Sequence, residues 1–259
     1  MTKFSIKNYS FSYGPTTILS EVNFDEIPRG KLVGLLGANG VGKSSFLRSI
    51  AGLETYTGSV KLDGSELQEQ NMYKRMKLVG YMPQTLPQAT SLTAYESVFS
   101  ACRAVRPDLS HQEVEARLED VFNTLGIREL AFKSLARMSG GQRQMVGLAQ
   151  VIVKRPELLL LDEPTSALDL RWQMGVFNVV KNMLTNSEAI CITALHDINL
   201  AMRHCDYIAL FADGKLISFG LPTDAINEVN LNEAYGVSAS IEISRAGYPF
   251  AIINGVTNE

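Results

Sequence analysis

The chain has 259 residues, of which 46% are hydrophobic and 20% are charged, and its formal net charge at pH 7 is −3. This length allows one large domain, or one domain with an added lobe, to bury a sizeable core. The slightly acidic balance argues against a protein that wraps nucleic acid electrostatically. The three cysteines show no metal-binding spacing, and their odd number favours reduced thiols over a disulfide framework.

The N-terminal region predicts neither a signal peptide nor a membrane-spanning helix. Lys3, Lys7 and Asn8 interrupt any apolar stretch there, and no run in the chain approaches the roughly 20 apolar residues that a membrane helix needs. We therefore expect the chain itself to be soluble, which still allows a membrane partner. Residues 3 to 35 predict short strands, because apolar and polar residues alternate before and after a loop that contains Tyr13.

The stretch from Gly37 to Ser44 predicts a phosphate-binding loop. It follows the apolar run 32–36, which predicts a buried strand, and precedes residues 45–52, whose apolar positions recur at helical spacing. This is the context that the pattern G-x-x-x-x-G-K-[ST] requires. The glycines let backbone N–H groups point into one concavity, Lys43 supplies a positive charge for the β- and γ-phosphates, and the Ser44 hydroxyl is a hard ligand for Mg²⁺. The alternative, a chance glycine-rich turn before Lys-Ser, does not explain the strand and helix on either side.

Strand patterns give way to helical ones after the loop. Residues 59–62 and 78–82 predict strands, the first entering a hairpin turn. From 88 to 137 the apolar residues follow helical spacing, and Ser110 to Glu113 has the sequence of a capping box. These residues predict a helical insertion in a frame that contains strands.

A second potential anion site begins at Ser139. The apolar residues behind it recur at i, i+3, i+4 and i+7, so a helix starts here with Ser139 as a favourable N-cap. Gly140 and Gly141 leave backbone N–H groups accessible at this helix start. On its own, the same sequence is also compatible with a simple capped loop.

Two apolar runs end in polar residues that suit nucleotide chemistry. The run 157–161 predicts a strand buried on both faces, and Asp162 and Glu163 follow it. Because ligands lie beyond the carboxyl ends of such strands, Asp162 is placed to hold Mg²⁺ and Glu163 to face a water. The run 189–195 predicts another core strand, and the following His196 can reach the same crevice. A hairpin at 207–219, a helix from Leu221 and a last hairpin around 241–252 complete the prediction.

Together these motifs, in this order, resemble the ATP-binding subunit of ABC transporters over nearly the whole chain. Gly37 to Ser44 is similar to the Walker A loop and Gln84 to the Q-loop glutamine. Ser139, Gly140, Gly141 and Gln142 are similar to the family signature, with Met138 at its leucine position. Asp162 with Glu163 matches Walker B and its following glutamate, the segment Ser166-Ala167-Leu168-Asp169 matches the D-loop, and His196 matches the switch histidine.

The resemblance implies an α/β fold, with a P-loop NTPase (ABC ATPase) core that has a mixed sheet, an antiparallel β subdomain and a helical subdomain. It implies a single nucleotide-binding domain over 1–259, with the helical subdomain at about 88–143 inserted in a RecA-like core. Residues 221–259 would form a short C-terminal extension.

The resemblance also implies ATP and Mg²⁺ as cofactors and a head-to-tail homodimer that encloses each ATP. The residues implied to contact the nucleotide are Tyr13, Gly37, Asn39, Gly40, Gly42, Lys43, Ser44, Ser45, Ser139, Gly140, Gly141, Gln142 and Asp169. Those implied for Mg²⁺ and its waters are Ser44, Gln84 and Asp162. Catalysis is assigned to Glu163, which polarises the attacking water, and to His196, Gln84 and Lys43.

Within the family, the compact length and the tail from Asn230 to Val237 are similar to the importer ATPases for iron–siderophore, haem and cobalamin complexes. This implies integral membrane permease subunits as partners, an indirect link to a substrate-binding protein, and a peripheral position on the cytoplasmic face of the inner (plasma) membrane. Nucleic acid is not among the expected partners. Trp172 departs from the histidine usual in that subgroup, so importers of metal ions or of oxyanions such as molybdate stay open. Two further alternatives are a soluble ABC-type ATPase without a permease and a nucleotide-dependent switch without turnover, and the presence of Glu163 and His196 argues against the switch.

Overall fold

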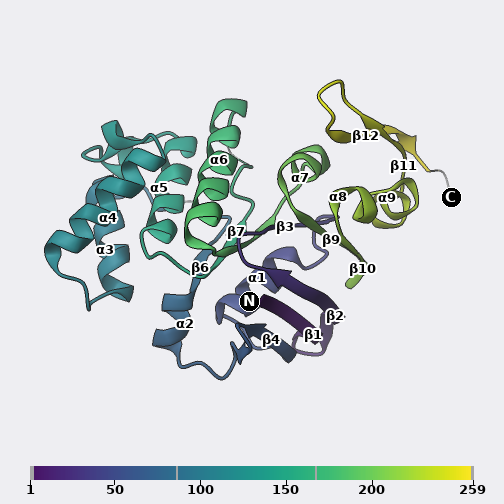
Figure 1. Ribbon diagram of the computed structural model, residues 1–259, viewed down its shortest axis with the longest axis horizontal. Helices are drawn as coiled ribbons and strands as arrows, with labels where there is room; N and C mark the ends of the chain where they lie inside the picture. Colours follow the sequence, from purple (N-terminus) through teal and green to yellow (C-terminus); the bar gives the residue numbers. More distant parts are fainter. Residues whose placement is uncertain (1–2, 86, 167, 258–259) are drawn as a thin grey trace.

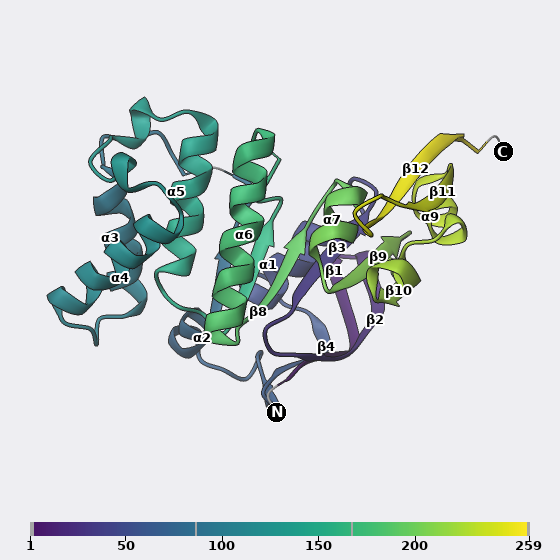
Figure 2. The same ribbon diagram turned by 45° about the horizontal axis from the view of Figure 1, so that its top comes forward.

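A computed structural model describes residues 3–85, 87–166 and 168–257. Figure 1 shows strands in the middle of the molecule, a group of helices at one end and the C-terminal hairpin at the other. The view in Figure 2 has the same arrangement. The fold is α/β, with a six-stranded mixed sheet, a four-stranded antiparallel sheet, a two-stranded C-terminal hairpin and a helical part, which confirms the predicted class.

The central sheet has six strands in the order β10-β9-β3-β8-β7-β6. β3 (Leu32–Gly37), β6 (Val79–Met82), β7 (Leu158–Asp162), β8 (Ile190–Ala194) and β9 (Tyr207–Ala212) are parallel, and β10 (Lys215–Gly220) is antiparallel to β9. Every residue of β3, β7 and β8 is buried, as expected for parallel strands covered on both faces. The phosphate loop, Asp162 and His196 therefore all lie at or just beyond the carboxyl ends of neighbouring central strands.

The antiparallel sheet covers one side of helix α1 (Lys43–Ala51). Its strand order is β2-β1-β4-β5, from β1 (Lys3–Tyr13), β2 (Thr16–Pro28), β4 (Thr57–Leu62) and β5 (Ser65–Glu66). The buried face of α1 carries Phe46, Leu47 and Ile50, and it shares one core with residues of both sheets. Ser49 on α1 lies 2.6 Å from the hydroxyl of Tyr9 on β1. The helix that follows the phosphate loop is thus fixed between the two sheets.

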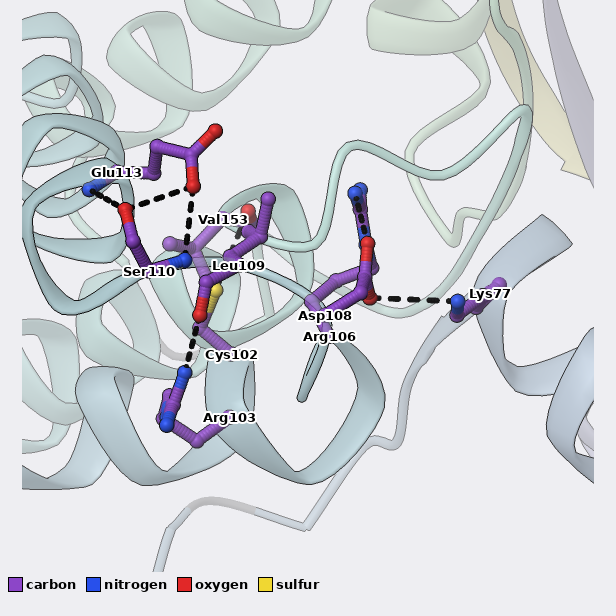
Figure 3. A network of polar contacts seen from close by, with 9 residues as sticks. All are labelled: Lys77, Cys102, Arg103, Arg106, Asp108, Leu109, Ser110, Glu113 and Val153. Atoms are coloured by element: carbon purple, nitrogen blue, oxygen red, sulfur yellow. Dashed lines mark hydrogen bonds and ion pairs between the residues drawn. The ribbon is translucent and has the colours of Figure 1, made fainter.

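The helical part consists of α3 (Ala94–Val105), α4 (His111–Thr124), α5 (Gly140–Ile152) and the short turns Arg128–Leu130 and Leu135–Arg137. The capping box predicted for Ser110 and Glu113 is confirmed, because the Ser110 hydroxyl accepts from the Glu113 backbone and the Glu113 carboxylate accepts from the Ser110 backbone (Figure 3). In the same turn, Asp108 pairs with Arg106 and with Lys77 of α2 (Met72–Leu78). The Lys77–Asp108 pair ties the helical part to the segment that enters β6.

The remaining helices are α6 (Leu170–Ser187), α7 (Ile198–His204), α8 (Pro222–Ala225) and α9 (Glu228–Tyr235), and the chain closes with the hairpin β11 (Val237–Ile243) and β12 (Pro249–Val256). The prediction of one helix from Leu221 is wrong in one respect. The Asn227 side chain accepts a hydrogen bond from Asn230 N and caps a new helix, so α8 and α9 are separate. Across the described ranges, no helix is both long enough and apolar enough to cross a bilayer.

Candidate functional site

The loop between β3 and α1 is open at the start of the helix. Gly42 occupies the N-cap position with φ 111°, and no described side chain caps this end of α1. A Cβ on Gly42 would lie 2.9 Å from Ile18 Cγ2, and a Cβ on Gly37 would lie 2.5 Å from the carbonyl oxygen of Phe211. Both positions therefore require glycine, and the free N–H groups at the helix start remain available to an anion.

Lys43 is buried beneath this loop. Its Nζ donates to the carbonyl oxygens of Gly37 at 2.5 Å and Ala38 at 3.1 Å. Burial lowers the pKa of Lys43, and the nearby carboxylates of Glu163 and Asp162 oppose that shift. The ammonium is thus held at the floor of the loop by two backbone carbonyl oxygens, which phosphate oxygens can replace.

Ser44 and Asp162 meet at the end of β7. The Ser44 hydroxyl donates to Asp162 Oδ1 at 2.9 Å, and the Tyr81 hydroxyl lies 3.4 Å from the other carboxylate oxygen. Burial raises the pKa of Asp162, which is only 2% exposed. In the described part of the chain, no three His, Cys, Asp or Glu side chains form a metal-binding group. The hydroxyl and carboxylate still fit Mg²⁺, which uses one or two protein oxygens and completes its shell with phosphate oxygens and waters.

Glu163 joins three segments. Its carboxylate accepts a hydrogen bond from Gln84 Nε2 at 2.7 Å and is paired with His196 Nε2. The backbone of Glu163 has φ 52°, an uncommon conformation for a non-glycine residue that often accompanies a functional constraint. These residues face a cavity of about 340 Å³, whose lining is Asn39, Gly40, Gly42, Lys43, Ser44, Ser45, Gln84, Glu163 and His196. All nine are among the residues predicted to bind nucleotide or act in catalysis.

The comparisons with known proteins decide the family. Residues 19–166 match the family model described as ABC transporter. The chain belongs to the ABC transporter family.

Relatives and solved structures cover almost the whole chain. The hemin import ATP-binding protein of Bordetella avium is 31% identical over 91% of this chain and 92% of its own length. The petrobactin import ATP-binding protein of Bacillus anthracis is 29% identical over 96% and 92%. A chain from an ABC transporter described as metal-chelate type, in an inward-facing conformation, matches with a TM-score of 0.82 at 21% identity over 98% of both chains. The chain is accordingly an ATP-binding ABC ATPase, and the last comparison supports its fold.

The ABC signature lies outside the cavity. Ser139 caps α5, its hydroxyl accepting from Gln142 N at 3.2 Å, while Gln142 Oε1 accepts from Ser139 N and from Lys133 Nζ. Among the described residues, Ser139, Gly140, Gly141 and Gln142 contribute nothing to the lining of the cavity. The α5 helix start is therefore capped by its own side chains, which bind the backbone N–H groups of Ser139 and Gln142.

Asp169 and Tyr13 are also apart from the cavity lining given above. Asp169 caps α6, with Oδ1 accepting from Trp172 N at 3.0 Å, and Ala167 of the same D-loop motif lies outside the described residues. Tyr13 is 45% exposed and packs edge-on against Phe11 with ring centroids 4.8 Å apart. Its exposed ring is accessible, but an adenine contact stays a prediction.

Three residues near the site are absent from the predicted set. Tyr81 contacts Asp162, Gln144 Nε2 lies 3.5 Å from the Glu163 carbonyl oxygen, and the Tyr235 hydroxyl accepts from Gly37 N at 2.8 Å. Strand alternation in 78–82 could have indicated Tyr81, because it precedes Gln84 by three residues in a strand that ends at the site. Nothing in the local sequence indicates that Tyr235 meets a residue 198 positions earlier.

Proposed function

We propose that this chain is the ATP-binding and ATP-hydrolysing subunit that powers an ABC importer for iron–siderophore, haem, cobalamin or another metal complex. The observation that carries the proposal is the extent of similarity to two proteins named for hemin and petrobactin import, which spans nine-tenths or more of each chain. The match includes much more than the shared ATPase motifs, which end near residue 196.

We assign phosphate binding to the loop and cation binding to Ser44 and Asp162. The loop N–H groups and Lys43 would hold the β- and γ-phosphates, since they surround one cavity at a helix N-terminus. Ser44, Asp162 and Gln84 would hold Mg²⁺ and its waters. When bound, Mg²⁺ offsets the negative charge of the phosphate oxygens.

Hydrolysis in this proposal depends on Glu163 and His196. The Glu163 carboxylate would accept a hydrogen bond from a water and take up its proton as the water oxygen bonds to the γ-phosphorus. The bond from that phosphorus to the bridging oxygen breaks, and ADP leaves with this oxygen. His196, whose Nε2 is paired with Glu163, can donate to a γ-phosphate oxygen and orient the water. Gln84, bound to the same carboxylate at 2.7 Å, connects this centre to the segment after β6.

We infer that a second copy completes each site. The cavity is lined by residues of the phosphate loop, the start of α1 and the segments that follow β6, β7 and β8. The described signature residues of the same chain are not part of this lining. In a head-to-tail dimer, Ser139 and Gly141 of the other copy would contact the γ-phosphate, and Asp169 would lie at the subunit boundary.

We also propose that permease subunits attach the chain to the cytoplasmic face of the inner (plasma) membrane. A groove of about 430 Å³ lies between the segment after β6 and helices α3 and α5, and its lining includes Met82, Pro87, Gln88, Ala101, Gly147 and Gln150. Its mainly apolar walls and its position next to Gln84 support a membrane-subunit helix as occupant. Movement there can reach Glu163 through Gln84.

The direct test is purification of the chain from detergent-solubilised membranes. We expect a multi-span membrane protein to copurify and the complex to hydrolyse ATP faster with its substrate-loaded binding protein. Uptake of iron supplied as haem or as a ferric siderophore, in cells with wild-type chain or Glu163→Gln, then tests the substrate class. A homodimer that binds no membrane protein would favour the alternative of an ABC-type ATPase without a permease, and uptake of zinc, manganese or molybdate alone would favour those importer classes.

A further inference from the structure

The C-terminal segment touches the candidate site through one hydrogen bond. The backbone N–H of Gly37, the first residue of the phosphate loop, donates to the hydroxyl of Tyr235 at 2.8 Å. Tyr235 is the last residue of α9, which packs beside the end of β9. The bond therefore joins the far end of the chain to the start of the loop.

Gly37 is held on both sides of its backbone. Its carbonyl oxygen accepts from Lys43 Nζ at 2.5 Å, while its N–H is bound by Tyr235. Leu35 O accepts a hydrogen bond from Leu195 N, so the backbone polar groups of Leu35 point toward β8. Because these groups alternate in direction along a strand, the N–H of Gly37 also points toward the β8 side. β8 ends at Ala194 and offers no strand partner there. The Tyr235 hydroxyl thus replaces an acceptor that the sheet no longer provides.

Tyr235 is itself firmly placed. Its neighbours Leu231 and Ala234 are buried, and Gly236 ends α9 in the left-handed conformation with φ 65°. Burial raises the pKa of the Tyr235 phenol to about 12, so the hydroxyl remains neutral near pH 7. The oxygen is consequently a fixed and uncharged acceptor.

The hairpin after Tyr235 is fastened to the helix that follows His196. Asn199 Nδ2 donates to Ala251 O at 3.2 Å, and Ala251 N donates to Asn199 Oδ1 at 2.7 Å. On the next turn of α7, the Arg203 guanidinium lies 5.1 Å from the ring centroid of Tyr248. Figures 1 and 2 show the hairpin beside α7, away from the helical part.

We infer that Tyr235 is a positioning residue for the phosphate loop, and that the β11–β12 hairpin, through Asn199 of α7, keeps its hydroxyl at Gly37. The inference rests on the proposed nucleotide site and assigns a role to the C-terminal extension. Loss of the hydroxyl leaves the Gly37 N–H without a partner and loosens the start of the loop. Since the loop holds phosphates in the ground state and the transition state alike, the effect falls on KM rather than on kcat.

The test is Tyr235→Phe in the full-length chain, with KM for MgATP and the dissociation constant for MgADP as readouts. We expect both to rise about five- to tenfold, with kcat at saturating MgATP within about twofold of wild type. Tyr207→Phe is the matched control, because it removes the hydroxyl of another half-buried tyrosine whose ring stacks on Phe219. The control should leave KM unchanged.

Asn199→Ala tests the fastening through α7. We expect a rise in KM of about two- to threefold, and no further rise when it is combined with Tyr235→Phe, because both act on one contact. Effects that multiply in the double variant would overturn the link through the hairpin. A Tyr235→Phe chain with wild-type KM, or with reduced kcat and unchanged KM, would overturn the positioning role. Failure of the wild-type chain to bind MgATP would instead overturn the nucleotide site itself.

Discussion

Helices α1 and α5 both start at a short segment that contains glycine and serine, yet their N-termini are capped differently. At α1 the N-cap is Gly42 and no described side chain binds the open backbone donors. At α5 the N-cap is Ser139, whose hydroxyl and whose partner Gln142 form a complete capping box. The first helix start has no side-chain cap, whereas at the second the capping box binds the backbone N–H groups of Ser139 and Gln142.

The surroundings of the two helix starts differ in the same sense. Near α1, Lys43 and Asp162 are buried with pKa values shifted toward their neutral forms by loss of solvent, and Glu163 has a positive φ. Near α5, the half-buried Lys133 donates to Gln142 at 2.9 Å and adds to the cap. The α1 site thus contains buried charges and a strained backbone that destabilise the empty site and that a charged ligand can relieve. The α5 site is a stable surface suited to contact a ligand held elsewhere.

The largest effect should come from Glu163→Gln, which removes the proposed base but keeps a similar shape beside the α1 site. We expect kcat to fall by at least about 100-fold, because a positioned general base contributes about that much or more. ATP binding should persist, and an ATP-bound dimer should accumulate. Steady-state phosphate release and size-exclusion chromatography with ATP measure the two effects. Undiminished hydrolysis would remove Glu163 from its assigned role.

The next test separates the two helix starts by ligand affinity. Ser44→Ala removes a proposed Mg²⁺ ligand, so the affinity of the single chain for MgATP should fall on the order of tenfold. Ser139→Ala should leave that affinity unchanged, because Ser139 lies outside its own chain's cavity, and should lower hydrolysis and ATP-dependent dimerisation instead. Calorimetric titration at low protein concentration distinguishes them. Equal loss of affinity in both variants would contradict the assignment of MgATP binding within one chain to the α1 helix start alone.

Local sequence predicted the α1 region well for physical reasons. The buried runs of β3, β7 and β8, the loop glycines and the polar residues at the strand ends are all encoded within short stretches, and parallel strands bring those ends to one edge of the sheet. The capping box at Ser110 is equally local. The roles assigned to these residues remain predictions.

Other features were not predicted, and two of them depend on contacts between distant segments. The Tyr235–Gly37 bond and the Asn199–Ala251 pair arise only once the tail has docked on the sheet. Helix α6 has no counterpart among the predicted elements, although Val176, Val180 and Leu184 recur on its buried face at intervals of four residues. Two short helices replaced the single one expected from Leu221, because Asn227 caps a new helix within that stretch.

A stability measurement can test whether the buried charge of Asp162 destabilises the empty site at α1. Burial raises the pKa of Asp162, so the unfolded chain releases this proton at lower pH than the folded chain, and the carboxylate costs stability as the pH rises past both values. Asp162→Asn should therefore stabilise the nucleotide-free chain by about 0.5–2 kcal/mol near pH 7, with a smaller gain near pH 4, close to the ordinary pKa of 3.8 for this side chain. Urea unfolding at both pH values provides the measurement, and the stabilisation by added MgATP should shrink. A destabilised nucleotide-free variant would show that Asp162 is already well accommodated.

The smallest effect should come from Ser139→Ala at the α5 helix start. This variant should lower the free energy of unfolding, whereas Asp162→Asn should raise it. Loss of the cap should cost about 1 kcal/mol of the free energy of unfolding, which corresponds to about 2–4 °C in Tm. Ser110→Ala is the matched control, because Ser110 and Glu113 form the same capping box on α4. Both variants should lose similar stability in urea, but only Ser139→Ala should lose hydrolysis, since Ser110 has no proposed contact with nucleotide. If Ser110→Ala lost as much activity as Ser139→Ala, the effect of the signature serine would be explained by helix capping alone.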